Sequence, residues 1–361
     1  MPGTIATPPR WATWSGYVAA AWSAAYCTLG LWWSLGGSGY PFGPATEDRR
    51  SGSVLEGAPV AVVGSAMTVV SAFGVAVGLA MAHGWLRGRW QKLALVYAWT
   101  AAAAFIIVIP DYTILAILAM WPAFLVFAFT GVPGAQDGLA DILYWHRVNL
   151  IIVFIGGVVW AAAALAHQRR TRHACVRCGR GEGHSEAWTS PEAALRWGRV
   201  AVRIALVSIV PYEVTRIAWY FGWPLGISRD FLQMMQDTPG MLEVGLGLAV
   251  MSIVGGILTH GLVASWGEVF PRWTWFAAGR RVPPALAIVP ATIVTLAIPS
   301  AAMMNVGQGA DLSNWALTVP GMLIVGWAAG LGAATYAYYL RRRSACRRCG
   351  QGAPAAAPSL L

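Results

Sequence analysis

The sequence predicts an all-α membrane protein of about eight transmembrane helices, built as a tandem parallel duplication of a four-helix unit. Composition is the first observation: 57% of the 361 residues are hydrophobic, 11% are charged, and the mean hydropathy is +0.56. A soluble domain carries about 25% charged residues. The second observation is a set of apolar stretches about 20 residues long, the length at which a helix crosses the hydrocarbon core. The third is a cysteine motif that occurs twice.

Eight stretches are apolar enough to be spans, and the positive-inside rule gives their orientation. Nineteen of the 25 Lys and Arg residues fall in loops on the side of the N-terminus. The start of the chain lacks the layout of a cleavable signal peptide, so the first span is expected to be retained. We therefore expect a bacterial plasma-membrane protein with cytoplasmic N- and C-termini. The predicted spans are 14–36, 57–82, 93–115, 148–166, 197–221, 240–265, 284–306 and 317–340.

One further stretch, residues 113–131, is also long enough to cross. A ninth span would place the two cysteine motifs on opposite sides of the membrane. We therefore predict a long kinked third helix followed by a re-entrant or interfacial segment. Pro110 and Pro122 supply the breaks.

The two halves of the chain share landmarks in the same order. Both close on nearly the same eight residues, "ACVRCGRG" and "ACRRCGQG", which agree at six positions. We expect a first repeat over 1–181, a cytoplasmic linker over 182–196 and a second repeat over 197–361. An even number of spans per repeat keeps both copies the same way up. The paired landmarks are Tyr26 and Tyr212, Trp33 and Trp219, Gly36 and Gly222, Pro41 and Pro224, Gly43 and Gly226, and His83 and His260.

Local signals place a helix start and two close helix contacts. In "TSPEAALRWGR", Ser190 is the expected N-cap and Pro191 occupies the first turn. The spacings Gly74 to Gly78 and Gly326 to Gly330 predict closely packed helices rather than a catalytic feature.

The repeated motif supplies four cysteines: Cys175, Cys178, Cys346 and Cys349. Two CxxCG turns together give the four thiolates of a tetrahedral zinc site, which would be structural because no coordination position is left open. A redox pair or sensor is an alternative, as are cysteines without a ligand role or sites shared between subunits. His173 and His184 are weaker candidate ligands, since loop histidines are mostly solvated.

Ionisable residues inside spans are functional candidates because burying a charge in a membrane is costly. Glu213 and Arg216 lie three residues apart on one helix face and are expected to pair, with Glu243 nearby; a purely structural pair is the alternative. Asp111 is a further candidate near the outer end of the third span. His83 and His260, at helix ends, are expected to be interfacial caps rather than haem ligands.

Three stretches carry a resemblance to a known group: "YEVTRIAWYFGWPLGIS", "WGEVFPRWTWFAAGRRVPP" and "YLRRRSACRRCGQG". The chain resembles an uncharacterised family of multi-pass membrane proteins of high-GC Gram-positive bacteria with paired CxxCG motifs. The resemblance implies no catalytic residues.

Three functions stay open at this point. A non-enzymatic transporter or permease-like module with a zinc clamp is favoured over a zinc- or thiol-responsive scaffold and over an enzyme acting on a lipid or isoprenoid. No P-loop, Gly-x-Ser-x-Gly or His-Glu-x-x-His motif occurs, which disfavours those enzyme classes. The net charge of +10 is explained by arginines flanking the spans, so nucleic acid is not an expected partner. Expected partners are membrane lipids and, as open alternatives, a second copy of the chain or a cytoplasmic protein.

Overall fold

The computed structural model describes residues 9–43, 53–119, 144–181, 187–307, 313–346 and 348–352. Within these ranges the regular structure is helical, apart from one antiparallel bridge between Val269 and Arg281. The chain divides into two compact units. Unit 1 consists of Met1–Thr113, Val132–Ser185 and Ser344–Leu361, and unit 2 of Ile114–Gly131 and Glu186–Arg343. The residues that follow the last helix therefore belong to the unit formed by the first half of the chain.

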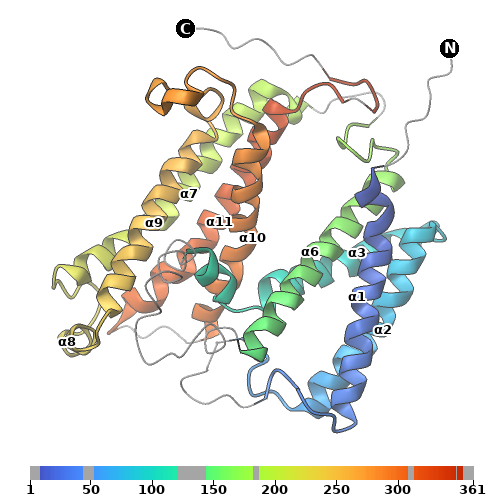
Figure 1. The fold of residues 1–361 in the computed structure, drawn as a ribbon, viewed down its shortest axis with the longest axis horizontal. Helices are drawn as coiled ribbons and strands as arrows, with labels where there is room; N and C mark the ends of the chain where they lie inside the picture. Colours follow the sequence, from blue (N-terminus) through green and yellow to red (C-terminus); the bar gives the residue numbers. More distant parts are fainter. Residues whose placement is uncertain are drawn as a thin grey trace. The chain divides into compact units, whose positions relative to one another are not determined.

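Unit 1 contains four long helical segments (Figure 1). The first, α1, packs against both the second and the fourth, α2 and α6, and the third, α3, packs against α6. The core of unit 1 is centred on Trp160 of α6, which is fully buried against alanines of α1 and α3. The segments are α1 (Arg10–Ser34), α2 (Val60–His83), α3 (Arg89–Ala103), continued by a π-helical turn (Ala104–Val108), and α6 (Trp145–Thr171).

Unit 2 repeats this scheme with its own four long helices and one short one. Here α7 packs against both α9 and α11, and α10 packs against α11. The first long helix of each unit thus contacts the second and the fourth, while the third contacts the fourth. The helices are α7 (Pro191–Tyr220), α8 (Arg229–Asp237), α9 (Met241–Gly261), α10 (Pro284–Gly307) and α11 (Trp315–Arg342).

Six of these segments are long and apolar enough to cross a membrane: α2, α3 with its π-helical turn, α6, α9, α10 and α11. The prediction of a helical membrane protein is confirmed at this level. Helices also form at the two other predicted spans, but α1 is rich in Trp, Ser and Gly and α7 carries several charges. Their mean hydropathy is therefore lower, although 25 and 30 residues are long enough to cross.

The tightest helix pair in each unit follows a seam of small residues. In unit 1 a Cβ on Gly78 would meet the backbone nitrogen of Ala20 at 3.0 Å, so α2 lies directly against α1. In unit 2 a Cβ on Gly330 would meet the carbonyl oxygen of Ala201 at 2.6 Å, which brings α11 against α7. The close packing predicted from the glycine spacings is confirmed.

The third predicted helix ends earlier than expected. Regular α-helix stops at Ala103 and a π-helical turn runs to Val108, just before Pro110. Proline has no backbone N–H and disfavours helical geometry at the residue before it, which explains the end. Residues 113–119 are helical again. The remainder of 113–131 lies outside the described residues, so its predicted re-entrant path stays a prediction.

The predicted helix start before α7 is confirmed. The Ser190 side chain accepts a hydrogen bond from the Ala193 N–H, and Pro191 is the first helical residue. Capping of this kind satisfies an N–H that has no partner inside the helix. The short α8 begins in the same way, with the Ser228 side chain accepting from the Phe231 N–H.

Candidate metal centre

Each CxxCG motif directly follows the last long helix of its half of the chain and folds into the same tight turn. In the first, the Cys175 N–H donates to the Arg180 carbonyl at 2.8 Å, and the Gly179 N–H donates to the Cys175 carbonyl at 2.7 Å. In the second, the Cys346 N–H donates to the Gln351 carbonyl at 3.0 Å, and the Gly350 N–H to the Cys346 carbonyl at 2.8 Å. The two turns therefore share one hydrogen-bonding pattern. We call them the first and second knuckle, residues 174–181 and 345–352.

Each knuckle needs its glycine. Gly179 has a φ of 73° and Gly350 a φ of 69°, a left-handed backbone that other residues adopt only at a cost. This conformation lets the chain reverse immediately after the second cysteine. Both cysteines of a knuckle can then face the same point.

The two knuckles lie together in unit 1, and their four sulfur atoms form one cluster. All four Sγ atoms lie within 4.8 Å of one another. The Cys175 and Cys346 Sγ atoms are 3.9 Å apart, and those of Cys178 and Cys349 are 3.6 Å apart. A zinc ion with four Zn–S bonds of about 2.3 Å requires S···S edges of about 3.8 Å in a tetrahedron. The cluster therefore fits a tetrahedral thiolate-bound metal ion, and no disulfide joins these four cysteines.

Arginines hold the knuckles in place. Arg180 of the first knuckle donates to the Gln351 carbonyl at 2.9 Å and to the Ser344 carbonyl at 3.3 Å, so it bridges to the second. Arg169, near the end of α6, donates to the Val176 carbonyl at 2.7 Å and ties the first knuckle to its helix. These cations also lie where four thiolates and a divalent ion would leave net negative charge.

The four thiols differ in burial and acidity. Cys178 and Cys346 are buried, whereas Cys349 is exposed. Burial raises the pKa of the Cys178 thiol to about 12. Burial also acts on Cys346, but the backbone N–H groups of Cys349 and Arg348 outweigh it and lower the pKa of this thiol to about 6. Binding of a metal ion to all four sulfurs would displace the remaining thiol protons.

The other predicted ligands are not found in this cluster among the described residues, and the redox alternative stays open. His173 is not among the residues whose ligand atoms cluster here, and His184 lies outside the described residues. Separations of 3.6 and 3.9 Å are far longer than a disulfide bond of about 2.05 Å. Four converging thiols leave no open position on a tetrahedral ion, which is the arrangement of a structural site rather than a catalytic one.

The charged candidates in the helices do not form the expected pair. Among the described residues no ion pair joins Glu213 and Arg216. The Glu213 carboxylate instead accepts a hydrogen bond of 2.9 Å from the Ser252 hydroxyl of α9. The Arg216 guanidinium lies over the rings of Trp219 and Tyr212, 4.1 and 4.7 Å from their centroids. Aromatic faces and carbonyl oxygens thus take the place of the carboxylate that the sequence suggested.

The two remaining candidates lie in contrasting environments. Glu243 is exposed in the first turn of α9, where a carboxylate faces the positive end of the helix dipole. Asp111, in unit 1, is 1% exposed. One of its oxygens accepts the Thr113 N–H at 2.8 Å, and the other has no hydrogen-bond partner in the part of the chain that the structure describes. The Asp111 carboxyl is therefore buried rather than exposed, and it bonds the backbone two residues further along the chain.

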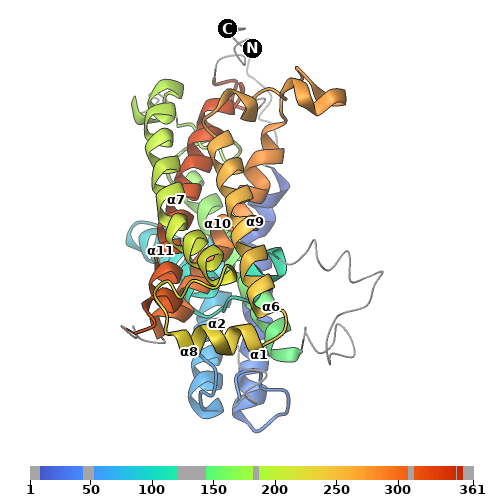
Figure 2. The ribbon, with the colours of Figure 1, turned by 90° about the vertical axis from the view of Figure 1, so that its left-hand side faces the viewer.

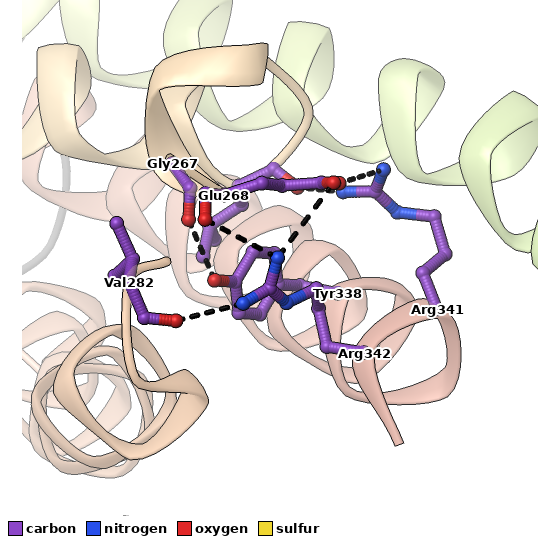
Figure 3. A network of polar contacts seen from close by, with 7 residues as sticks. Gly267, Glu268, Val282, Tyr338, Arg341 and Arg342 are labelled. Carbon is purple, nitrogen blue, oxygen red and sulfur yellow. Dashed lines mark hydrogen bonds and ion pairs between the residues drawn. The ribbon is translucent and has the colours of Figure 1, made fainter. Parts of the chain in front are cut away.

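Sequence reasoning missed a polar network in unit 2 (Figure 3). Glu268 pairs with Arg341 at 2.8 Å and with Arg342 at 3.7 Å, and the Tyr338 hydroxyl donates to the Gly267 carbonyl at 2.6 Å. The network fastens the loop after α9 to the end of α11. Glu268 is the single acid between α9 and α10, and that isolation among arginines is the signal that could have revealed it.

Comparisons with models of protein families, with curated proteins and with solved structures found no match to this chain. The resemblance noted from the sequence accordingly stays a prediction.

Proposed function

We propose that this protein is an integral membrane protein of the transporter or permease type whose cysteines hold one Zn²⁺ in a closed structural clamp. The observation that carries the clamp is the convergence of four Sγ atoms within 4.8 Å from two knuckles 171 positions apart. Zinc is the ion that four thiolates in a tetrahedron select in a structural site. Since the second knuckle directly follows α11, the ion would fasten the end of the second half of the chain to unit 1.

A tandem duplication accounts for the clamp. It is supported by the shared packing scheme of the two units and by the shared hydrogen bonds of the two knuckles. In this proposal α1 and α7 are spans too, giving four per copy and eight in all. An even number per copy returns both knuckles to the same side. The arginine bias assigns that side to the cytoplasm, with both termini, in the plasma membrane of a bacterium.

Metal analysis of the purified protein tests the clamp. We expect about one zinc ion per chain in the wild type, because a closed tetrahedral site binds a single ion. Cys346→Ser should lose most of the zinc. Cys27→Ser is the matched control, because Cys27 lies in α1 outside the cluster. Undiminished zinc in Cys346→Ser, or none in the wild type, would overturn the proposal; ready loss to a weak chelator from an intact fold would favour the scaffold or sensor instead.

The transport role rests on Arg216. A guanidinium within a long helix of a membrane protein is a functional candidate. Its NH1 group donates to the Ala316 carbonyl at 3.3 Å and to the Thr215 hydroxyl at 3.4 Å. These contacts are long for charged hydrogen bonds, which are usually about 2.7–2.9 Å. The group therefore retains capacity to bind an anionic or polar substrate, with the Glu213 and Ser252 pair between the same helix and α9.

Cysteine accessibility tests the transport role. In a Cys27→Ser background, Glu213→Cys should react with a membrane-impermeant thiol reagent applied from outside, because a transport route admits water. Val207→Cys is the control, since Val207 is an apolar α7 residue with 71% exposure and is expected to face hydrocarbon. If Glu213→Cys stays as unreactive as Val207→Cys while the protein retains its zinc, the route is absent and the transport role fails separately from the clamp.

A further inference from the structure

Unit 2 contains an apolar cavity of about 330 Å³ that neither the clamp nor the charged helix residues explain. It lies between α9, α10 and α11, near the polar network of Glu268. Residues of all three helices and of the loop after α9 line it, among them Leu258, Leu262, Leu286, Val294, Trp327 and Leu331. This volume falls in the range of small-molecule sites, and the lining suits a hydrocarbon group.

The loop between α9 and α10 builds one wall of this cavity. It covers residues 262–283 and contributes Trp266, Phe270 and Pro271 to the lining. The corresponding loop of unit 1, between α2 and α3, covers only residues 84–88. The cavity wall is therefore a feature of the second unit.

Within this loop, residues 270–281 form a small hairpin whose tip is a 3-10 helical segment (Arg272–Ala277), beyond the ends of α9 and α10 (Figure 2). The Phe270 N–H donates to the Arg280 carbonyl at 2.9 Å, and the Gly279 N–H to the Phe270 carbonyl at 3.0 Å. At its tip Trp275 is 80% exposed and Phe276 is 87% exposed. Trp275 has a φ of 40°, a strained conformation for a bulky residue. A strained backbone residue and two large exposed apolar side chains thus occur together at this tip.

Charge surrounds these aromatic residues. Arg272, Arg280 and Arg281 are all exposed on the same hairpin. Exposed aromatic side chains interleaved with arginines are typical of segments that lie at the membrane interface, where the rings reach the acyl boundary and the cations meet phosphate. Because the hairpin and the cavity wall are one loop, a lipid whose headgroup meets the arginines is well placed to extend a chain into the cavity.

The polar network ties the cavity wall to the end of α11. Tyr338 bonds the Gly267 carbonyl at 2.6 Å, Arg341 bonds the Leu262 carbonyl at 2.6 Å, and Arg342 bonds the Val282 carbonyl at 2.7 Å (Figure 3). All three accepting residues line the cavity. The wall is thereby fixed before any ligand arrives, which lowers the cost of binding.

We propose that this cavity holds one acyl chain of an anionic phospholipid, with Trp275 and Phe276 inserted at the headgroup boundary and the hairpin arginines facing the phosphate. The site does not depend on zinc or on transport.

Photolabelling of the full-length protein tests the site. The protein is placed in nanodiscs of phosphatidylcholine containing phosphatidylglycerol with a photoreactive group at the end of one acyl chain, and adducts are mapped by mass spectrometry. Adducts should concentrate on residues 286–294 and on Trp327. Unlabelled phosphatidylglycerol should compete about fivefold better than phosphatidylcholine for each arginine engaged. Adducts spread evenly over the helices of both units would overturn the proposal, and equal competition would overturn the assignment of an anionic headgroup.

Matched variants separate binding from folding. Ala291→Phe fills the cavity and should abolish the concentrated adducts, whereas Ala285→Phe, on the same helix but exposed and outside the lining, should not. Arg272→Gln with Arg280→Gln should reduce the preference for phosphatidylglycerol, while the exposed Arg87→Gln of the unit 1 loop should leave it unchanged. The arginine pair is exposed, so it tests the site even where the cavity variant fails to fold. Full labelling of a folded Ala291→Phe protein, or an unaltered preference in the arginine variant, would contradict the proposal.

Discussion

The Sγ atoms of Cys178 and Cys349 lie 3.6 Å apart although the residues are separated by 171 positions. A bond through a shared metal ion would close the chain into a ring that includes all the long helices of unit 2, α7 to α11. Closing a loop of 100 residues or more lowers the entropy of the unfolded chain by an amount worth about 4–5 kcal/mol. This entropy loss of the unfolded chain grows only slowly with loop length. A ring of this size therefore stabilises the folded state only slightly more than a ring of 100 residues would.

Metal removal should release the second knuckle. Chelation of the purified protein is expected to increase the rate of tryptic cleavage between residues 341 and 348 on the order of tenfold, because opening of this segment no longer has to break metal–sulfur bonds. The Cys27→Ser protein with its metal should be cleaved like the wild type. An unchanged rate after confirmed metal loss would show that the arginine contacts alone hold the knuckle.

The knuckle glycines can be tested without touching a ligand. Gly350→Ala should weaken zinc binding about fivefold to thirtyfold, because a left-handed backbone costs a residue with a Cβ about 1–2 kcal/mol. A Cβ at this position meets no neighbour, so the effect is purely conformational. Gly181→Ala is the control, since Gly181 has open space and no positive φ. Equal affinities of the two variants, measured by competition with a chromophoric chelator, would contradict this account.

The Glu268 network should contribute more to the stability of the folded protein than its position near the surface suggests. Glu268→Gln removes the partner of two arginines whose side chains are 11% and 16% exposed. Because the glutamate side chain is itself 35% exposed, solvent screening reduces the loss to about 1–2 kcal/mol. Thermal unfolding followed by light scattering would measure the shift. Asp237→Asn, at the exposed end of α8, should have almost no effect, and a similar shift in both variants would count against the network.

Two glycine substitutions should change the stability of the folded protein in opposite directions. Gly330→Ala would place a Cβ 2.6 Å from the Ala201 carbonyl oxygen, so α7 and α11 must separate at a cost of about 1–3 kcal/mol. Gly247→Ala in α9 meets no atom and should stabilise the protein by about 0.5–1 kcal/mol through helix propensity. Stability measured side by side decides the point: a destabilised Gly247→Ala or a neutral Gly330→Ala would refute the packing argument.

The sequence by itself determined the helical membrane class, the positions of the long helices, the start of α7 at Ser190 and the glycine seams. These features depend on local composition and spacing, which the chain carries without reference to its partners. The four cysteines could be proposed as one site only because their motif is repeated.

Tertiary structure decided which side chains meet. It separated Glu213 from Arg216, because the Ser252 hydroxyl and the rings of Trp219 and Tyr212 satisfy the two charges independently. It turned Asp111 inward and joined Glu268 to the end of α11, 73 positions away. Contacts of this kind depend on the rotation and depth of packed helices. A difference of one residue in helix register turns a side chain by about 100°, which hydropathy does not record.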